Sequence, residues 1–147
     1  MRTVQEYFCE YEGHHCNKYN KMTHYFGIPL IILGLMGLLA RIPYSFEVYA
    51  GYRIDFAIIT TVAVYFLFYI RMHFLLSIFM LICLGGLYVG AQYLSLYILW
   101  GVFVVGWILQ LLGHIIFEKE KPSFMDNLVH LLIGPLWILN NIVKCVK

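Results

Sequence analysis

The stretch that decides the fold is "MHFLLSIFMLICLGGLYVGAQYLSLYILWGVFVVGWILQLLGHIIF", residues 72–117, because it contains no Asp, Glu, Lys or Arg. One helical crossing of a bilayer needs ~20 apolar residues. This run is long enough for two crossings and must therefore fold back on itself. The region 85–95, which holds three glycines, a glutamine and a serine, is the natural place for the turn. We expect helices over 73–91 and 94–117.

Further charge-free runs cover 22–40, 56–70 and 127–143, and the whole chain is 62% hydrophobic and only 12% charged. This balance excludes a water-soluble domain. We predict one integral membrane domain over 1–147, an all-α, polytopic bundle of about four to five hydrophobic helices. The expected segments are 25–41, 54–70, 73–91, 94–117 and 125–143. Two runs, 56–70 and 127–143, are short for a full span, so tilted, interfacial or half-inserted helices are expected there.

The polar N-terminal segment, 1–21, lacks the apolar core of a signal peptide and is expected to be retained. Val4, Tyr7, Phe8 and Tyr11 recur at helical spacing, which predicts a short amphipathic helix along the membrane surface. The four cysteines show no CxxC spacing, so neither a disulfide framework nor a thiolate zinc site is indicated. A net charge of +2 gives no sign of nucleic acid as a partner.

The parity of the crossings places histidines together. If the first four segments each cross once, His24 at the start of the first and His114 at the end of the fourth lie at one depth. The fifth segment begins on that side, so His130 joins them. Basic residues are somewhat more numerous on this side, which indicates that it is cytoplasmic.

His24 and His114 each have a polar residue one helical turn away. Asn20 and His24 share a face, as do Gln110, His114 and Glu118. His15 and His24 are about half a turn out of phase on a straight helix, so a shared site requires a bend, for which the stretch 17–20 is suited. The first helix would then start near Asn20, with an irregular early turn at 27–29.

Imidazole at membrane depth is costly and tends to mark function, although a histidine at a helix end can also lie among lipid headgroups. His14 is expected to be exposed, and His73 to be interfacial. For His15, His24 and His114 the companions favour a metal ion over structural hydrogen bonding. Both readings stay open for His130.

Neutral imidazoles, with an occasional carboxylate, are the ligands that hold iron, copper or zinc. Glu118 could complete the ligand set, or it could pair with Lys119 or Lys121 as the solvated end of a helix, which we favour. Asn17, Asn20 and Gln110 could orient the imidazoles or bond a substrate carboxylate.

The chain also resembles the 2-hydroxy fatty acid dioxygenase family of fatty-acid α-oxidation, over nearly its whole length from Tyr7 onward. Two motifs in the right order carry the resemblance. The first is H-x-N-x-x-N-x-x-x-H-x-x-G-I-P, formed by His15, Asn17, Asn20, His24, Gly27, Ile28 and Pro29. The second is G-W-I-x-Q-x-x-G-H-x-x-F-E-K-x-x-P, formed by Gly106, Trp107, Ile108, Gln110, Gly113, His114, Phe117, Glu118, Lys119 and Pro122.

The resemblance implies a small multi-pass protein, in the endoplasmic reticulum membrane of a eukaryote or the inner membrane of a bacterium. It implies an Fe(2+)-dependent enzyme that shortens a 2-hydroxy acyl chain by one carbon, with His15, His24 and His114 as iron ligands. Two positions depart from the fungal pattern, which has Pro at Lys18 and Gln at His130. His130 could then be a fourth ligand or a proton-handling residue.

The implied partners are a long-chain 2-hydroxy fatty acid, O2 and membrane lipid. Conversion of the hydroxy acid to the acid one carbon shorter, carbon dioxide and water balances one O2, so no 2-oxoglutarate or nicotinamide cofactor is required. An acyl tail gains free energy for every methylene kept out of water. Tyr25, Phe26 and Trp107 are expected to line its entrance, and Glu118 is a further candidate for substrate contact.

Three other classes of membrane protein also combine apolar helices with histidines. A di-iron hydroxylase or desaturase would need about eight histidines in its boxes, whereas the chain has six. A b-type haem protein needs only two axial histidines, and His24 with His114 could serve. A non-catalytic scaffold or transporter would use the histidines as interfacial hydrogen-bonding groups.

Overall fold

The computed structural model describes residues 2–49 and 52–146, and these residues form an α-helical protein with one small β-hairpin. The predicted all-α membrane class is confirmed. The elements in chain order are α1 (Val4–Gly13), α2 (Lys18–Ala40), β1 (Phe46–Tyr49), β2 (Tyr52–Ile54), α3 (Phe56–Val64), the π-helical turn η1 (Tyr65–Tyr69), α4 (Ile70–Met72), α5 (Phe74–Gln92), α6 (Leu96–Leu112), the π-helical turn η2 (Gly113–Glu118), the 3-10 turn η3 (Ser123–Met125) and α7 (His130–Val143).

Within the described residues, three helices are long and apolar enough to cross a membrane: Lys18–Ala40, Phe74–Gln92 and Leu96–Glu118. At 1.5 Å per residue, the 23-residue helices reach about 34 Å, compared with ~30 Å for a hydrocarbon core. Phe56–Met72 and His130–Val143 are apolar but shorter. These are the two segments that the sequence predicts to be short for a full span.

Several boundaries differ from the predicted ones. Helix α2 begins at Lys18, two residues before the expected start near Asn20, because the Asn17 side chain accepts a hydrogen bond from the Tyr19 amide at the helix start. The predicted irregular turn at 27–29 is wrong, since α2 continues through Pro29. Helix α7 begins at His130 rather than near 125. The preceding residues form η3 and a turn in which the Asn127 side chain accepts a hydrogen bond from the Val129 amide.

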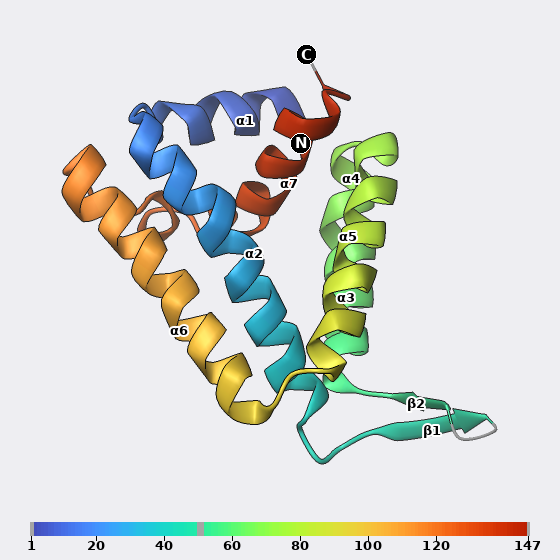
Figure 1. Ribbon diagram of the computed structural model, residues 1–147. Helices are drawn as coiled ribbons and strands as arrows, with labels where there is room; N and C mark the ends of the chain where they lie inside the picture. Colours follow the sequence, from blue (N-terminus) through green and yellow to red (C-terminus); the bar gives the residue numbers. More distant parts are fainter. Residues whose placement is uncertain (1, 50–51, 147) are drawn as a thin grey trace. The chain divides into compact units, whose positions relative to one another are not determined.

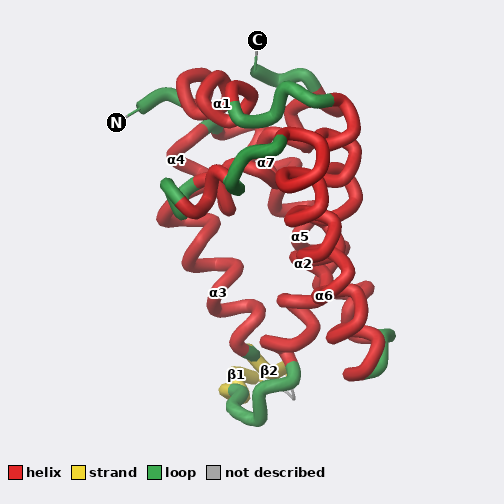
Figure 2. The backbone as a smooth tube through the Cα atoms, turned by 90° about the vertical axis from the view of Figure 1, so that its left-hand side faces the viewer, coloured by secondary structure: helices red, strands yellow, loops and turns green. Residues whose placement is uncertain are grey.

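The chain divides into two compact units: residues 1–31 with 104–147, and residues 32–103. In the second unit an antiparallel hairpin pairs Phe46 with Ile54. Its strands β1 and β2 lie at the start of α3 (Figure 2). No sequence pattern predicted this hairpin. Asp55 caps α3 through the Ile58 amide and accepts a 2.7 Å hydrogen bond from the Tyr88 hydroxyl on α5.

Helix α1 packs on α7 within the first unit (Figure 1). Thr3 and Glu6 form a capping box at its start. Its predicted apolar stripe is real, but Val4, Phe8 and Tyr11 are buried inside the protein instead of facing a membrane surface. The Trp137 indole on α7 donates a 2.9 Å hydrogen bond to Glu12, which holds the two helices together.

Glycines let α2 and α6 approach closely in the first unit. A Cβ on Gly106 would lie 2.8 Å from the Gly27 carbonyl oxygen, so only glycine fits at this crossing. Directly after α6, at the first residue of η2, a Cβ on Gly113 would collide with the side chains of Asn20 and Thr23. This close antiparallel pair brings the start of α2 beside the end of α6, as the parity of the crossings predicts.

Candidate metal centre

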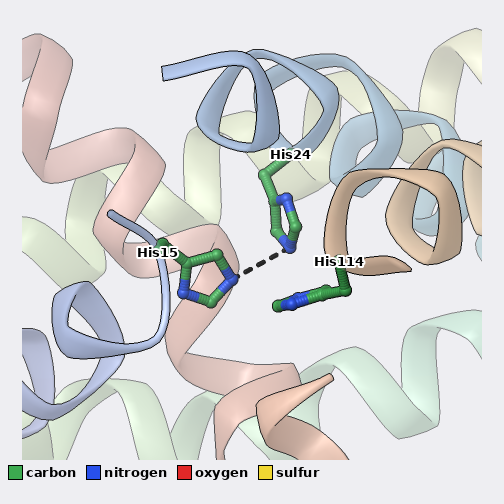
Figure 3. Close-up of side chains that lie close together, drawn as sticks. All are labelled: His15, His24 and His114. Carbon is green, nitrogen blue, oxygen red and sulfur yellow. Dashed lines mark hydrogen bonds between the residues drawn. The ribbon is translucent and has the colours of Figure 1, made fainter. Parts of the chain in front are cut away.

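Three imidazoles from three separate segments converge inside the first unit, as Figure 3 shows. His15 lies in the linker between α1 and α2, His24 in α2 and His114 in the turn η2. Each offers a ring nitrogen, and these nitrogens all lie within 4.8 Å of one another. The three side chains are 0–2% exposed. Separations of this size allow the three rings to hold one metal ion.

The His15 ring is fixed from two directions by Tyr11. Its Nδ1 donates a 2.6 Å hydrogen bond to the Tyr11 carbonyl oxygen. The Tyr11 ring stacks on the imidazole with centroids 4.1 Å apart and an interplanar angle of 16°. Helix α1 ends at Gly13, so the bend that the sequence requires between His15 and His24 lies in residues 14–17.

The protonation of His15 and His24 follows from their carbonyl partners. Nδ1 of His24 donates to the Asn20 carbonyl oxygen at 2.9 Å, as Nδ1 of His15 does to Tyr11. A carbonyl can only accept, so each Nδ1 carries a proton, and a neutral ring then has a bare lone pair at Nε2. The two Nε2 atoms face each other at 3.0 Å.

Two facing lone pairs need a cation between them, either a proton or a metal ion. The environment opposes the proton, because burial and the neighbouring His24 ring lower the pKa of His15 to about 3. At neutral pH this imidazole is therefore unprotonated at Nε2. A histidine that binds a metal ion is usually neutral, with one ring nitrogen on the metal and the N–H of the other donating a hydrogen bond to a carbonyl or carboxylate.

His114 completes the group from a π-helical turn. Its ring centroid lies 4.8 Å from that of His15 and 4.9 Å from that of His24. Its Nδ1 is buried and has no hydrogen-bond partner among the residues that the structure describes. The same holds for Nε2 of Gln110, one turn earlier, and for Oδ1 of Asn20. A π-helical turn frequently accompanies a functional site.

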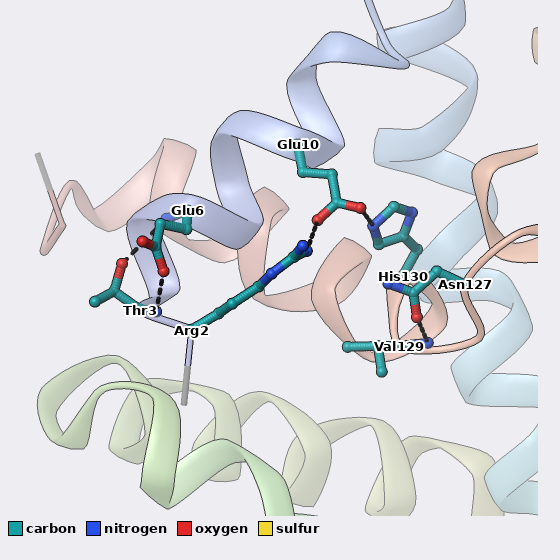
Figure 4. A network of polar contacts seen from close by, with 7 residues as sticks. All are labelled: Arg2, Thr3, Glu6, Glu10, Asn127, Val129 and His130. Atoms are coloured by element: carbon teal, nitrogen blue, oxygen red, sulfur yellow. Dashed lines mark hydrogen bonds and ion pairs between the residues drawn. The ribbon is translucent and has the colours of Figure 1, made fainter.

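His130 is not part of this cluster, and its ring lies beside Glu10 (Figure 4). The His14 ring is a second neighbour. Nε2 of His130 is 3.5 Å from a Glu10 carboxylate oxygen, and the His130 ring centroid is 5.9 Å from that of His14. The side chain is buried, and neither ring nitrogen has a close hydrogen-bond partner among the described residues. Glu10 also pairs with Arg2 at 2.6 Å.

Glu118 is not the solvated helix end that the sequence favours. Its Oε1 accepts a 2.7 Å hydrogen bond from the Asn17 amide and a 3.1 Å bond from the Asn20 side chain. Lys121, one of its two expected partners, pairs with Asp126 instead. The sequence could not predict this, because the partners are about a hundred positions away along the chain.

The aromatic candidates for a substrate entrance pack against different neighbours. Tyr25 lies against Trp137, with ring centroids 5.7 Å apart. Trp107 lies against Phe124 at 5.5 Å, and Phe26 is exposed. The sequence analysis did not predict the stacking of Tyr11 on His15, although residues four apart on a helix lie on one face and can form such a pair.

Fold and site together define a helical protein with membrane-spanning segments and a buried cluster of three histidines that could hold a metal ion. The model of the family described as "2-hydroxy-palmitic acid dioxygenase Mpo1-like" matches residues 1–145, and the chain belongs to this family. The resemblance found from the two motifs is confirmed.

A curated relative extends the comparison. The chain is 27% identical over 131 residues to 2-hydroxy-palmitic acid dioxygenase MPO1 of Saccharomyces cerevisiae. The match covers 88% of this chain and 73% of the relative. No solved structure matches the chain.

Proposed function

We propose that this protein is an iron(II)-dependent dioxygenase that shortens 2-hydroxy long-chain fatty acids by one carbon. The observation that carries the proposal is the convergence of His15, His24 and His114, with two bare Nε2 atoms facing each other at 3.0 Å. The family supports the substrate class and the use of dioxygen. The apolar helices support a membrane setting.

The donor set suits a ferrous ion. Imidazole nitrogens bind iron, copper and zinc alike, and three protein ligands leave positions free for other groups. A bound Fe(2+) supplies those open positions and the redox chemistry that dioxygen requires. His15, His24 and His114 would hold it, while the carbonyl groups of Tyr11 and Asn20 keep the first two rings in the ligating tautomer.

The remaining polar groups can receive the head of the substrate. The unpaired amide nitrogen of Gln110 can donate to a carboxylate, and the unpaired Oδ1 of Asn20 can accept from a hydroxyl. A buried polar atom without a partner costs free energy, so a bound hydroxy acid would remove that cost. Asn17 and Asn20 also orient the ligands, and His130 is the candidate for moving a proton.

The chemical balance defines the reaction. A 2-hydroxy acid and O2 yield the acid one carbon shorter, carbon dioxide and water. The bond between the carboxyl carbon and C2 breaks, C2 is oxidised to the new carboxyl group, and O2 is reduced. All electrons come from the substrate, so no further reductant is needed.

The acyl tail explains the setting in a membrane. Each methylene kept out of water contributes roughly 0.8 kcal/mol, so a long chain remains in the lipid while its head enters the site. Tyr25, Phe26 and Trp107 are the proposed lining of that entrance. We place the site on the cytoplasmic side, in the endoplasmic reticulum membrane of a eukaryote or the inner membrane of a bacterium.

The experiment that tests the proposal uses the purified full chain in detergent. Fe(2+), oxygen and 2-hydroxyhexadecanoic acid are added, and mass spectrometry follows the acid one carbon shorter. We expect this product from the wild type and a loss of at least about a hundredfold in His15→Ala, His24→Ala and His114→Ala. Absence of the product with iron bound would contradict the proposal, and full activity in one variant would remove that residue from the ligands.

A haem protein is the alternative that the geometry disfavours. A porphyrin between His24 and His114 would have to displace His15, whose ring centroid lies 4.4 and 4.8 Å from the other two. The same preparation is therefore expected to show iron without a Soret band. A scaffold with purely structural histidines would bind no stoichiometric metal, and the facing lone pairs weigh against it.

A further inference from the structure

Hydrogen bonds across the first unit join the segments that carry the three histidines. His114 is separated from the other two by most of the chain, so nothing covalent holds it near them. Glu118, at the end of the same π-helical turn, reaches the Asn17 amide and the Asn20 side chain. The Asn17 side chain also donates to the Phe117 carbonyl oxygen at 3.1 Å. The linker and the first turn of α2 are thereby fastened to η2.

Each partner of Glu118 leads on to a candidate metal ligand. The Asn20 side chain donates to the carboxylate, while its carbonyl oxygen receives Nδ1 of His24. Asn17 follows His15 by two residues, so its amide sets the path of the linker behind that imidazole. Glu118 lies on the same turn as His114, and its Oε1 accepts hydrogen bonds from the segments that carry His15 and His24. One carboxylate oxygen therefore links the His114 turn to the backbone of both other histidines.

The charge of the carboxylate suits its place. The Asn17 amide opens the N-terminus of α2, where the unpaired N–H groups and the helix dipole favour an anion. Hydrogen bonds to a charged acceptor are roughly twice as strong as neutral ones. An anion next to three neutral imidazoles also attracts a divalent cation that they hold, which makes its binding more favourable.

The position of Glu118 is narrowly defined by the backbone. The turn η2 ends at Glu118, and Lys119 then adopts a left-handed conformation with φ of 59°. The Lys119 and Glu120 amides both return to the His114 carbonyl oxygen. The ring of His114 and the carboxylate of Glu118 thus belong to one turn that backbone hydrogen bonds close.

We infer that Glu118 is a positioning residue, whose carboxylate sets the separation of His114 from His15 and His24 through Asn17 and Asn20. The sequence-based expectation that Glu118 contacts substrate stays a separate prediction. The inference rests on the proposed metal site and names a residue on which its affinity depends. Removal of such an outer hydrogen-bond partner typically weakens metal binding 10–100-fold.

The test measures the affinity of the purified full chain for Co(2+) alone by competition with a chelator. Glu118→Ala removes both the charge and the acceptor, and we expect about 10–100-fold weaker binding. Glu118→Gln keeps an oxygen that can accept both bonds, so a loss of less than about tenfold and an unchanged visible Co(2+) spectrum are expected. Glu47→Gln is the control, since it removes an exposed carboxylate from strand β1 of the other unit and should bind within about twofold of wild type.

A second variant separates positioning from general instability. Asn20→Ala removes one donor from the opposite side. The double variant should bind the metal no more weakly than Glu118→Ala alone, because the hydrogen bond that Asn20→Ala removes is one of the two that Glu118→Ala already removes. Thermal unfolding without metal identifies variants that do not fold, in which case Glu118→Gln and Asn20→Ala carry the test.

The outcomes distinguish this inference from the proposed function. Wild-type affinity in Glu118→Ala would overturn the positioning role alone. An altered spectrum in Glu118→Gln, with an affinity as low as in Glu118→Ala, would also overturn it, since Glu118 would then be a direct ligand. A wild type that binds no metal would contradict the proposed function and the positioning role together.

Discussion

At the scale of single residues, the protonation of His15 determines how the site responds to pH. Burial and the His24 ring lower its pKa to about 3 in the folded protein, whereas an unfolded histidine titrates near 6.5. Between these two values the unfolded chain binds the additional proton and the folded chain does not. The free energy of unfolding therefore falls as the pH falls below about 6.5.

We predict that the metal-free protein loses thermal stability between pH 7 and pH 4, and that His15→Gln loses less over the same range. The difference between the two proteins should approach a few kcal/mol, with up to about 4 kcal/mol available from His15 at pH 3. Differential scanning fluorimetry in detergent measures it. Parallel pH curves for the two proteins would show that His15 is protonated as readily in the folded state as in the unfolded chain.

At the scale of elements, the close approach of α2 and α6 sets the distance between His24 and His114. Gly113 lies directly beside His114, and any side chain there would meet Asn20 and Thr23. Gly101 lies on the same helix, and a Cβ added to it would meet nothing within 4 Å. The two glycines therefore form a matched pair for testing the crossing.

Gly113→Ala is expected to destabilise the protein by about 1–3 kcal/mol, because well-packed helices accommodate an added methyl group poorly. It should also weaken metal binding, since Asn20 must move. Gly101→Ala should leave both properties unchanged or raise the stability slightly, given the higher helix propensity of alanine. Thermal unfolding and Co(2+) titration of both variants check this. Equal behaviour of the two would mean that the crossing is looser than described.

The depth of the histidines could be predicted from the sequence, but the directions of their side chains could not. Parity and helical spacing predicted that His24 and His114 share a depth, and that His15 reaches them through a bend. Depth does not determine the direction in which a side chain points. His130 belongs to the same side in sequence terms, yet it faces Glu10 and His14, because the packing of α1 on α7 directs it there.

Other features needed contacts between distant parts of the chain. The pairing of β1 with β2 depends on contacts between the strands, for which these short and aromatic-rich stretches have no strong sequence pattern. The amphipathic stripe of α1 predicted an apolar face but not its partner, and α7 covers it rather than lipid. The bonds of Glu118 likewise join residues about a hundred positions apart.

At the scale of the whole molecule, orientation in the membrane can be tested with native cysteines. Cys16 lies next to His15 and is exposed, and Cys83 is exposed on the apolar helix α5. If the site faces the cytoplasm, a membrane-impermeant maleimide should label a protein with Cys16 as its single cysteine in inside-out vesicles only. A protein retaining only Cys83 should resist the reagent from both sides, because lipid covers that position. Labelling of Cys16 from the outside would reverse the proposed orientation.

The central claim is that imidazoles from both ends of the chain hold one ion. The most direct measurement is X-ray absorption spectroscopy, combined with metal analysis, on the protein loaded anaerobically with Fe(2+). We predict one iron per chain with about three imidazole ligands, and loss of that iron in His15→Ala, His24→Ala and His114→Ala. Iron bound without imidazole ligands, or retained at full stoichiometry when His24 and His114 are both replaced, would contradict the account.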